Sequence, residues 1–212
     1  MIAMRLCIVV ALLAMTGCDT VLIDSPIGEK LPRAEAAKLM GRWTDDDQNL
    51  IELQLSNEGE VVFGALSWND RTQRFDAASK VLDLRKIDDA IYVFATEDKE
   101  PDEGDAKRDG FESDASANHD SQSRGEKSQF IFFRVGIINE SQIHLYLADA
   151  KAVREAVQAG KIDGIAKKRS KSTDVFIKAS EQNSKAFVAS KQWGTLFQSE
   201  PTFKLKLIKK AT

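Results

Sequence analysis

Short segments of alternating apolar and polar residues recur along the chain and constrain its fold more than any other feature. In Leu50–Leu55 every second side chain is a large aliphatic one, and the two between them are Glu52 and Gln54. This period of two is typical of a half-buried β-strand. The turn sequence Asn57-Glu58-Gly59 follows at once. A chain with this pattern is expected to form hairpins joined in an antiparallel meander.

The same patterning predicts several further strands. Val61–Trp68 is apolar on both of its faces, so we expect both faces to be covered. The last third of the chain is predicted to add three short strands to the six that precede it. The predicted strands are Leu50–Leu55, Val61–Trp68, Val81–Ile87, Ile91–Thr96, Phe130–Ile137, Ile143–Leu147, Ile165–Arg169, Val175–Ile177 and Phe203–Leu207.

Three helices are also expected. Pro32 can open a short helix that ends at Gly41, because proline favours the first turn of a helix. Asp149 can cap a second helix, which Gly160 would end. Ser180 can cap a third, with an apolar stripe of Ala186, Ala189, Trp193 and Leu196.

The fold class predicted from these elements is α+β, with an antiparallel β-meander as an open sheet or a partial barrel and two to three packed helices. A chain of 212 residues with 42% hydrophobic content is long enough for one well-buried core. We therefore expect a single domain over residues 32–212. Residues 97–129 carry almost no large apolar side chains, which predicts a mobile acidic insertion.

The charges are distributed unevenly. The formal net charge is only −3, but residues 18–150 hold 15 Lys/Arg against 28 Asp/Glu, whereas residues 151–212 hold 14 against 5. The overall balance gives no reason to expect a nucleic-acid partner. The opposed charges favour mutual attraction within one fold, and a basic face turned toward anionic lipid is the alternative.

The first seventeen residues have the layout of a secretory signal peptide. Arg5 is their single charge, an apolar run follows from Leu6 to Met15, and small residues precede Cys18. The apolar run is too short for a spanning helix, which needs about 20 residues. The end of the signal, Met15-Thr16-Gly17-Cys18, resembles the lipobox of bacterial lipoproteins, although the family usually has Leu where this chain has Met15.

The lipobox resemblance implies that Cys18 becomes the first residue of the mature chain and carries diacylglycerol and an N-linked acyl group such as palmitate. The cysteine count agrees, because Cys7 lies within the signal and leaves Cys18 without a disulfide partner. Residues 18–31 are then expected to be a lipidated tether. The alternatives are an ordinary cleaved signal with a chance cysteine, or an uncleaved anchor.

Asp19 bears on location, because Asp at this position matches the signal that retains lipoproteins in the inner membrane of enteric bacteria. The expected location is therefore the bacterial cell envelope, facing the periplasm. The inner membrane is favoured and the outer membrane is the alternative.

No recognised catalytic motif is present. His119 and His144 are far apart in sequence and lack the spacing of a metal site, so no metal and no cofactor is expected. Carboxylate pairs such as Asp88-Asp89 and Asp102-Glu103 fall in predicted turns or in the insertion rather than in a dry cleft. These observations favour a non-enzymatic protein, and an enzyme of unrecognised type remains the alternative.

Two polar stretches invite a binding hypothesis. Residues 44–49 place oxygen ligands at alternate positions, but they lack the glycine and glutamate of a calcium loop, so an acidic turn is the favoured interpretation. The second stretch is basic and is interpreted either as the solvated face of a strand or as a patch for an anionic surface. It comprises Lys167, Lys168, Arg169 and Lys171.

Gly41-Arg42-Trp43 follows a predicted short helix and precedes the meander. This arrangement resembles the GxW motif of lipocalins and lipocalin-like barrels. The resemblance implies that Trp43 packs across the base of a barrel and that the barrel binds a small apolar ligand. The alternative is that Trp43 is simply a core aromatic residue where a strand begins.

Two functions are therefore expected. The first is a membrane-anchored, non-enzymatic binding or assembly module that contacts another envelope protein. The alternative is a lipocalin-like carrier of a small apolar ligand.

Lipidation yields a direct prediction. The intact mass of the native protein should exceed that of residues 18–212 by the mass of its acyl groups, and Cys18→Ser should abolish the increment, because the thioether needs the thiol. Mass spectrometry of protein extracted from membranes measures this. Secreted protein of unmodified mass would contradict the prediction.

Overall fold

The computed structural model describes residues 20–97, 128–168, 173–179 and 193–211, and most of them lie in β-strands. The helical elements of this part are short. They are α2 (Arg33–Ala36), the 3-10 helix η1 (Ala37–Leu39), α3 (Ala150–Gln158) and the 3-10 helix η3 (Trp193–Leu196). The strands are β1 (Thr20–Ile23), β2 (Glu29–Lys30), β3 (Gly41–Thr44), β4 (Leu50–Leu55), β5 (Val61–Asn69), β6 (Arg74–Ile87), β7 (Ala90–Thr96), β8 (Phe130–Asn139), β9 (Gln142–Leu147), β10 (Gly164–Lys168), β11 (Thr173–Ile177) and β12 (Phe203–Lys210).

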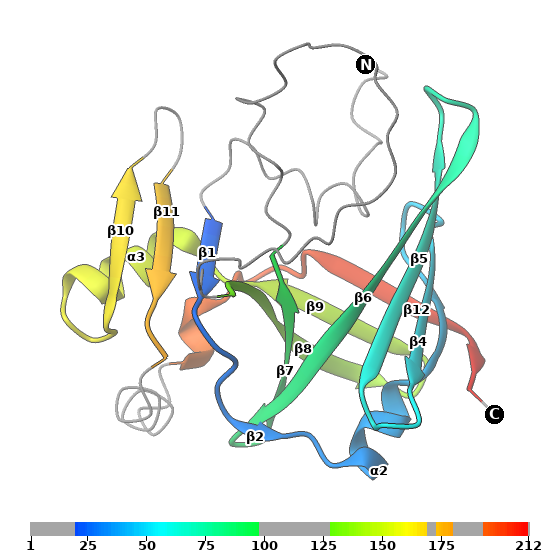
Figure 1. Cartoon of the computed structure of the whole chain (residues 1–212), viewed down its shortest axis with the longest axis horizontal. Coiled ribbons are helices and arrows are strands. Elements are labelled where there is room, and N and C mark those ends of the chain that lie inside the picture. The colour runs from blue at the N-terminus through cyan, green and yellow to red at the C-terminus, as the bar shows by residue number, and fades with distance from the viewer. Residues whose placement is uncertain (1–19, 98–127, 169–172, 180–192, 212) are drawn as a thin grey trace, which may run out of the picture.

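Eight of these strands form a closed antiparallel barrel (Figure 1). Strands β3 to β9 pair in sequence order, except that the C-terminal strand β12 lies between β3 and β9. Strand β9 pairs with both β12 and β8, which joins the two ends of the sheet. The ring leaves none of its members as a free edge over the paired residues.

The predicted fold class is therefore wrong. An α+β fold with an open or partial sheet and two to three packed helices was expected, whereas the structure is mostly β and its sheet closes. Closure depends on contacts such as Leu207 opposite Trp43, which are remote in sequence and leave no trace in local periodicity. The third predicted helix falls largely in residues 180–192, outside the described residues.

Most individual strand predictions are confirmed. Strand β4 has the predicted bounds, and β5, β7, β8 and β9 differ from theirs by a few residues at most. Strand β6 begins at Arg74, seven residues earlier than expected. The alternation pattern did not reveal this part of the strand, because the segment before Val81 is rich in small and polar side chains. The N-cap prediction for α3 is also confirmed, since the Asp149 carboxylate accepts hydrogen bonds from two backbone N–H groups of the first turn.

The inner face of the barrel is apolar. Residues directly opposite one another on neighbouring antiparallel strands point to the same face of the sheet. From β3 to β6 the facing residues Trp43, Ile51, Ala65 and Ala78 form one such row. A second row runs from β6 to β9 through Leu84, Val93, Phe133 and Leu147.

The base of the barrel is closed by the segment before β3. Trp43 is 1% exposed, and its indole Nε1 donates a hydrogen bond to the Leu39 carbonyl at 3.0 Å. Leu31, Leu39 and Met40 are buried in the same cluster. The α2–η1 segment thus packs against the lower end of the apolar interior.

A second core lies outside the barrel wall. Tyr92 and Phe94 on β7 and Phe132 on β8 alternate with the inward-facing residues and are almost fully buried. Val153 of α3 and Val175 of β11 belong to the same buried cluster. The small sheet β10-β11-β1, seen at the left of Figure 1, adjoins the barrel where Ile23 pairs with Phe130.

The segment predicted to be a tether is partly built into this second layer. Thr20–Ile23 forms β1, which runs parallel to β11, and Val21, Leu22 and Ile23 are buried. The described part of the expected tether, residues 20–31, therefore includes the strands β1 and β2. The predicted insertion at 97–129 lies almost entirely outside the described residues.

Trp43 yields a stability prediction. Trp43→Ala should lower the free energy of unfolding by about 3–5 kcal/mol, because it opens a cavity at the barrel base. Trp68→Ala removes the same side chain from an exposed position, 46% accessible, and should change stability by only about 0.5 kcal/mol. Urea unfolding followed by circular dichroism measures both. Equal effects would contradict the assignment of Trp43 as the core tryptophan.

Candidate functional site: the barrel interior

The interior of the barrel is the candidate binding site. Its lower half is tightly packed, with Trp43, Ile51 and Leu84 all buried. Several other inward-facing apolar side chains remain partly exposed although they lie in the wall of a closed sheet. They are Phe63, Leu82, Ile91, Val93, Leu145 and Phe203.

Val93 is the most informative of these residues. It sits at the middle of β7, opposite Leu84 on one side and Phe133 on the other, and both of these neighbours are buried. A side chain in the middle of a filled barrel would be buried as well. Val93 nevertheless keeps part of its surface exposed.

The inner face becomes polar toward the tip of the β5–β6 hairpin. Ser67 faces Asp76, and Lys80 faces Phe63. The Asp76 carboxylate accepts a hydrogen bond of 2.6 Å from the Asn69 side chain, and the Lys80 ammonium donates one to the Thr96 carbonyl at 2.9 Å. The barrel lining thus grades from apolar at the base to polar at this end.

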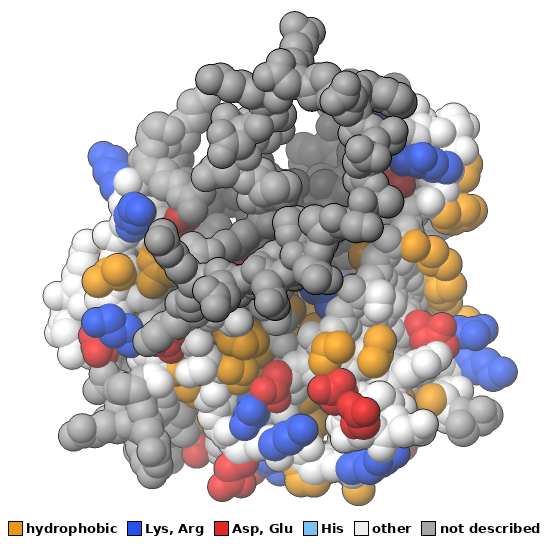
Figure 2. Space-filling model, in the orientation of Figure 1, with side chains coloured by type: hydrophobic (Ala, Val, Ile, Leu, Met, Phe, Trp, Pro, Cys, Tyr) orange, Lys and Arg blue, Asp and Glu red, His pale blue; other side chains and the backbone are white. Residues whose placement is uncertain are grey.

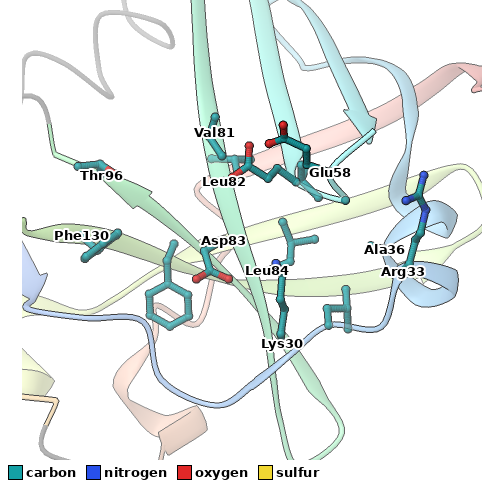
Figure 3. Close-up of a pocket in the computed structure, with 15 residues that line it drawn as sticks. Lys30, Arg33, Ala36, Glu58, Val81, Leu82, Asp83, Leu84, Thr96 and Phe130 are labelled. Atoms are coloured by element: carbon teal, nitrogen blue, oxygen red, sulfur yellow. The ribbon is translucent and has the colours of Figure 1, made fainter. Parts of the chain in front are cut away.

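A second hollow lies beside β6, where inward-facing residues such as Leu82 line it together with outward-facing ones such as Val81. This groove of about 550 Å³ runs between the β4–β5 turn and the segment that enters α2 (Figure 3). Leu82, Leu84 and Phe130 contribute apolar surface, while Glu58 and Arg33 stand at one side. It offers a mixed polar and apolar surface rather than an enclosed apolar one.

The carboxylate of Asp83, which lines this groove, is paired with the Arg85 guanidinium. Both oxygens of Asp83 accept hydrogen bonds from Arg85, at 2.9 and 2.7 Å, and the two side chains are each about a quarter exposed. Arg85 also donates to the Gly28 carbonyl at 3.4 Å. A bidentate pair of this kind fixes the local chain, so Asp83 is held in a structural role.

Two ionisable groups have shifted pKa values. Burial in the second core raises the pKa of Tyr92 to about 12, with Asp88 adding to the rise and Arg134 opposing it. The phenol is therefore neutral at physiological pH. A hydrogen bond from Gln54 is the main cause that lowers the pKa of Glu52, with Arg42 acting in the same direction against some desolvation.

The structure explains both residues of the Gly41–Trp43 motif. Gly41 has φ +148°, and a Cβ at this position would lie 2.6 Å from the Lys209 carbonyl oxygen. Glycine therefore permits the close approach of β12 to β3. Two residues later, Trp43 is buried in the cluster that also contains Leu39 and Met40.

The acidic stretch at residues 44–49 is a turn between β3 and β4. Asp45 is 5% exposed, and one carboxylate oxygen accepts hydrogen bonds from the backbone N–H groups of Asp47 and Asn49, each at 2.9 Å. The other oxygen accepts from the Asn49 side chain at 2.9 Å. Within the described residues, no three His, Cys, Asp or Glu side chains are grouped to hold a metal ion.

The other candidate residues are scattered. Lys167 and Lys168 are exposed on β10, at the outer edge of the small sheet, whereas Arg169 and Lys171 lie outside the described residues. Cys18, Asp19, His119 and the Asp102-Glu103 pair lie outside them as well. His144 on β9 is half-buried, and its Nε2 lies 3.1 Å from the Gln142 amide nitrogen. Of the candidates that the structure describes, Lys167, Lys168 and His144 all lie outside the barrel interior.

Sequence reasoning missed the upper part of this interior. Ala78 and Lys80 face inward from the part of β6 that was not predicted to be a strand. The alternation of Phe75, Ala77 and Ser79 with these residues carries the period of two, but small side chains weaken its contrast.

Comparisons with protein-family models, with curated proteins and with solved structures found no match. Among the helices that the structure describes, none is long and apolar enough to cross a membrane.

The Asp45 turn yields a prediction that separates a structural role from calcium binding. Asp45→Ala should destabilise the protein by about 1–3 kcal/mol, because three donors lose their acceptor. Asp46→Ala removes a neighbouring carboxylate whose recorded contact is an exposed ion pair with Lys206, and should have little effect. Thermal unfolding measures both variants. A melting temperature of the unmodified protein that rises with added calcium would contradict the structural role.

Proposed function

We propose that this chain is a non-enzymatic binding protein of the bacterial cell envelope, anchored through an acylated Cys18, whose barrel holds a small apolar ligand. The observation that carries the ligand proposal is the partial exposure of Val93 within a closed apolar barrel. Apolar surface removed from water gains about 25 cal/mol per Å², so an apolar molecule is the occupant that this lining favours.

The barrel closure also strengthens the lipocalin-like interpretation. A short helical segment precedes Trp43, this residue seals one end, and eight antiparallel strands enclose the interior. Barrels of eight strands have just enough room for side chains or one small ligand. The polar residues near the hairpin tip suit a ligand whose polar end points that way.

The Cys18 anchor supplies the location in this proposal. Acyl chains would hold the barrel on the periplasmic face of a membrane, and Asp19 favours the inner one. Two or three chains give stable attachment, because a single chain provides only marginal binding.

The ligand proposal predicts that filling the space beside Val93 weakens binding. Val93→Phe should raise the dissociation constant for the uncharged fluorophore N-phenyl-1-naphthylamine at least tenfold, equivalent to about 1.4 kcal/mol. Fluorescence titration measures this. Ile165→Phe is the matched control, because Ile165 is 57% exposed on β10 and lies outside the barrel.

A further variant distinguishes fluorophore binding in the barrel interior from binding in the groove beside β6. Val81 lines the groove and is 53% exposed on the outer face of β6. Val81→Asp should leave fluorophore binding unchanged. Loss of binding in Val81→Asp with normal binding in Val93→Phe would move the site to the groove. Purified protein that carries no small molecule and binds no fluorophore would remove the ligand proposal.

A further inference from the structure

The β5–β6 hairpin projects beyond the barrel. Its two strands pair from Val61 opposite Leu82 to Asn69 opposite Arg74, whereas β7 pairs with β6 only from Leu82 onward. The outer part of the hairpin therefore has no described strand on its β7 side. Figure 1 shows this part rising past the barrel at the upper right.

One face of the projecting hairpin is apolar and exposed. Trp68 lies opposite Phe75, and Leu66 lies opposite Ala77. The exposed fractions are 46% for Trp68, 67% for Phe75 and 41% for Leu66. Figure 2 shows hydrophobic side chains gathered along the edge of the molecule that this hairpin forms. We call Leu66, Trp68, Phe75 and Ala77 the hairpin patch.

The hairpin patch is an ordered surface. The Trp68 and Phe75 rings meet edge to face with centroids 5.1 Å apart, and the indole Nε1 donates a hydrogen bond of 3.0 Å to the Asp70 carboxylate. Asn69 accepts hydrogen bonds from the backbone of Arg71 and Thr72, which shapes the turn. Aromatic side chains held in place lose little entropy when they are buried by a partner.

The chemistry of the tip suits a lipid bilayer. Tryptophan concentrates at the boundary between headgroups and acyl chains, where its ring is buried and its N–H stays near polar groups. Two arginines, Arg71 and Arg74, stand beside the patch and are balanced by Asp70 and Asp76. The tip has no net formal charge, so apolar insertion rather than attraction by lipid charge would drive its contact.

The position of the anchor places the bilayer on this side of the molecule. Cys18 is two residues before Thr20, the first residue of β1, and two residues of extended chain span at most about 7 Å. Because β1 is built into the sheet, an acylated Cys18 holds the start of β1 close to the membrane surface. In Figure 1 the start of β1 is the upper end of that strand, and the hairpin tip lies higher, at the upper right.

We propose that the hairpin patch inserts into the headgroup region of the membrane that holds the lipid anchor. The proposal rests on the acylation of Cys18 proposed above. Two contacts, the anchor and the hairpin, would fix the orientation of the barrel on the bilayer.

Fluorescence quenching by brominated lipids tests this insertion. Acylated full-length mature protein is placed in phosphatidylcholine vesicles brominated either near the headgroup end or near the methyl end of the acyl chain. Tryptophan emission of the unmodified protein minus that of Trp68→Phe reports on Trp68. We expect this emission to fall strongly in vesicles of the lipid brominated near the headgroup end, and less in vesicles of the lipid brominated near the methyl end.

A control and an independent readout keep the two proposals separate. Ile138→Trp in the Trp68→Phe background places an exposed tryptophan near the β8–β9 turn, at the other end of the barrel, and its emission should not be quenched. Intact mass and vesicle flotation report on acylation alone. Acylated, floating protein with unquenched Trp68 would overturn the hairpin proposal and leave the anchor intact, and would point to a protein partner for the patch. Protein without acyl groups would overturn the anchor, and the hairpin proposal would fall with it.

Discussion

The pairing of β12 with both β3 and β9 is the constraint on which the rest of the structure depends. It brings the last described strand between the first strand of the barrel and the seventh, and it turns a meander into a ring. Leu205 and Leu207 thereby join the cluster that contains Trp43. Without this strand, β3 and β9 would each present an unpaired edge and the apolar inner face would open to water.

Closure also brings the basic and acidic parts of the sequence next to each other. The basic last third supplies β12, which is inserted between strands of the acidic part, and Lys206 forms an exposed ion pair of 3.4 Å with Asp46. Such a pair adds little stability by itself. The opposed charges of the two stretches are therefore brought together within one sheet.

Strands β7 and β8 serve two cores at once. Val93 and Phe133 face the barrel interior, while Phe94 and Phe132 stack on the outer face with centroids 5.7 Å apart. The outer face of this part of the wall is therefore covered by α3 and the small sheet.

Local sequence pattern predicted the elements of this fold better than their assembly. The clear alternation in Leu50–Leu55 gave the bounds of β4, and Asp149 marked the start of α3. The closure depends on contacts between residues more than 150 positions apart, as between Trp43 and Leu207, and periodicity carries no information on such pairings.

The candidate sites show the same difference between local features, which the sequence predicts, and long-range features, which it does not. Gly41 and Trp43 were identified because their spacing is local, and the structure gives each a physical reason. The interior position of Val93 could not be predicted, since it depends on which strands close the ring. Val61–Trp68 was expected to be covered on both faces, but its outer face is exposed at Leu66 and Trp68 because the hairpin projects past its neighbours.

The burial of β1 changes what a lipid anchor would do to this domain. A free tether of fourteen residues, from 18 to 31, would let the barrel turn freely above the membrane. With Val21, Leu22 and Ile23 packed beside β11, only about two residues would separate the sheet from acyl chains on Cys18. Under the proposed acylation, the side of the molecule that carries the start of β1 would face the bilayer, and so would the polar end of the barrel interior at the hairpin. An apolar ligand entering or leaving by that end would pass between barrel and bilayer over a short path, without crossing bulk water.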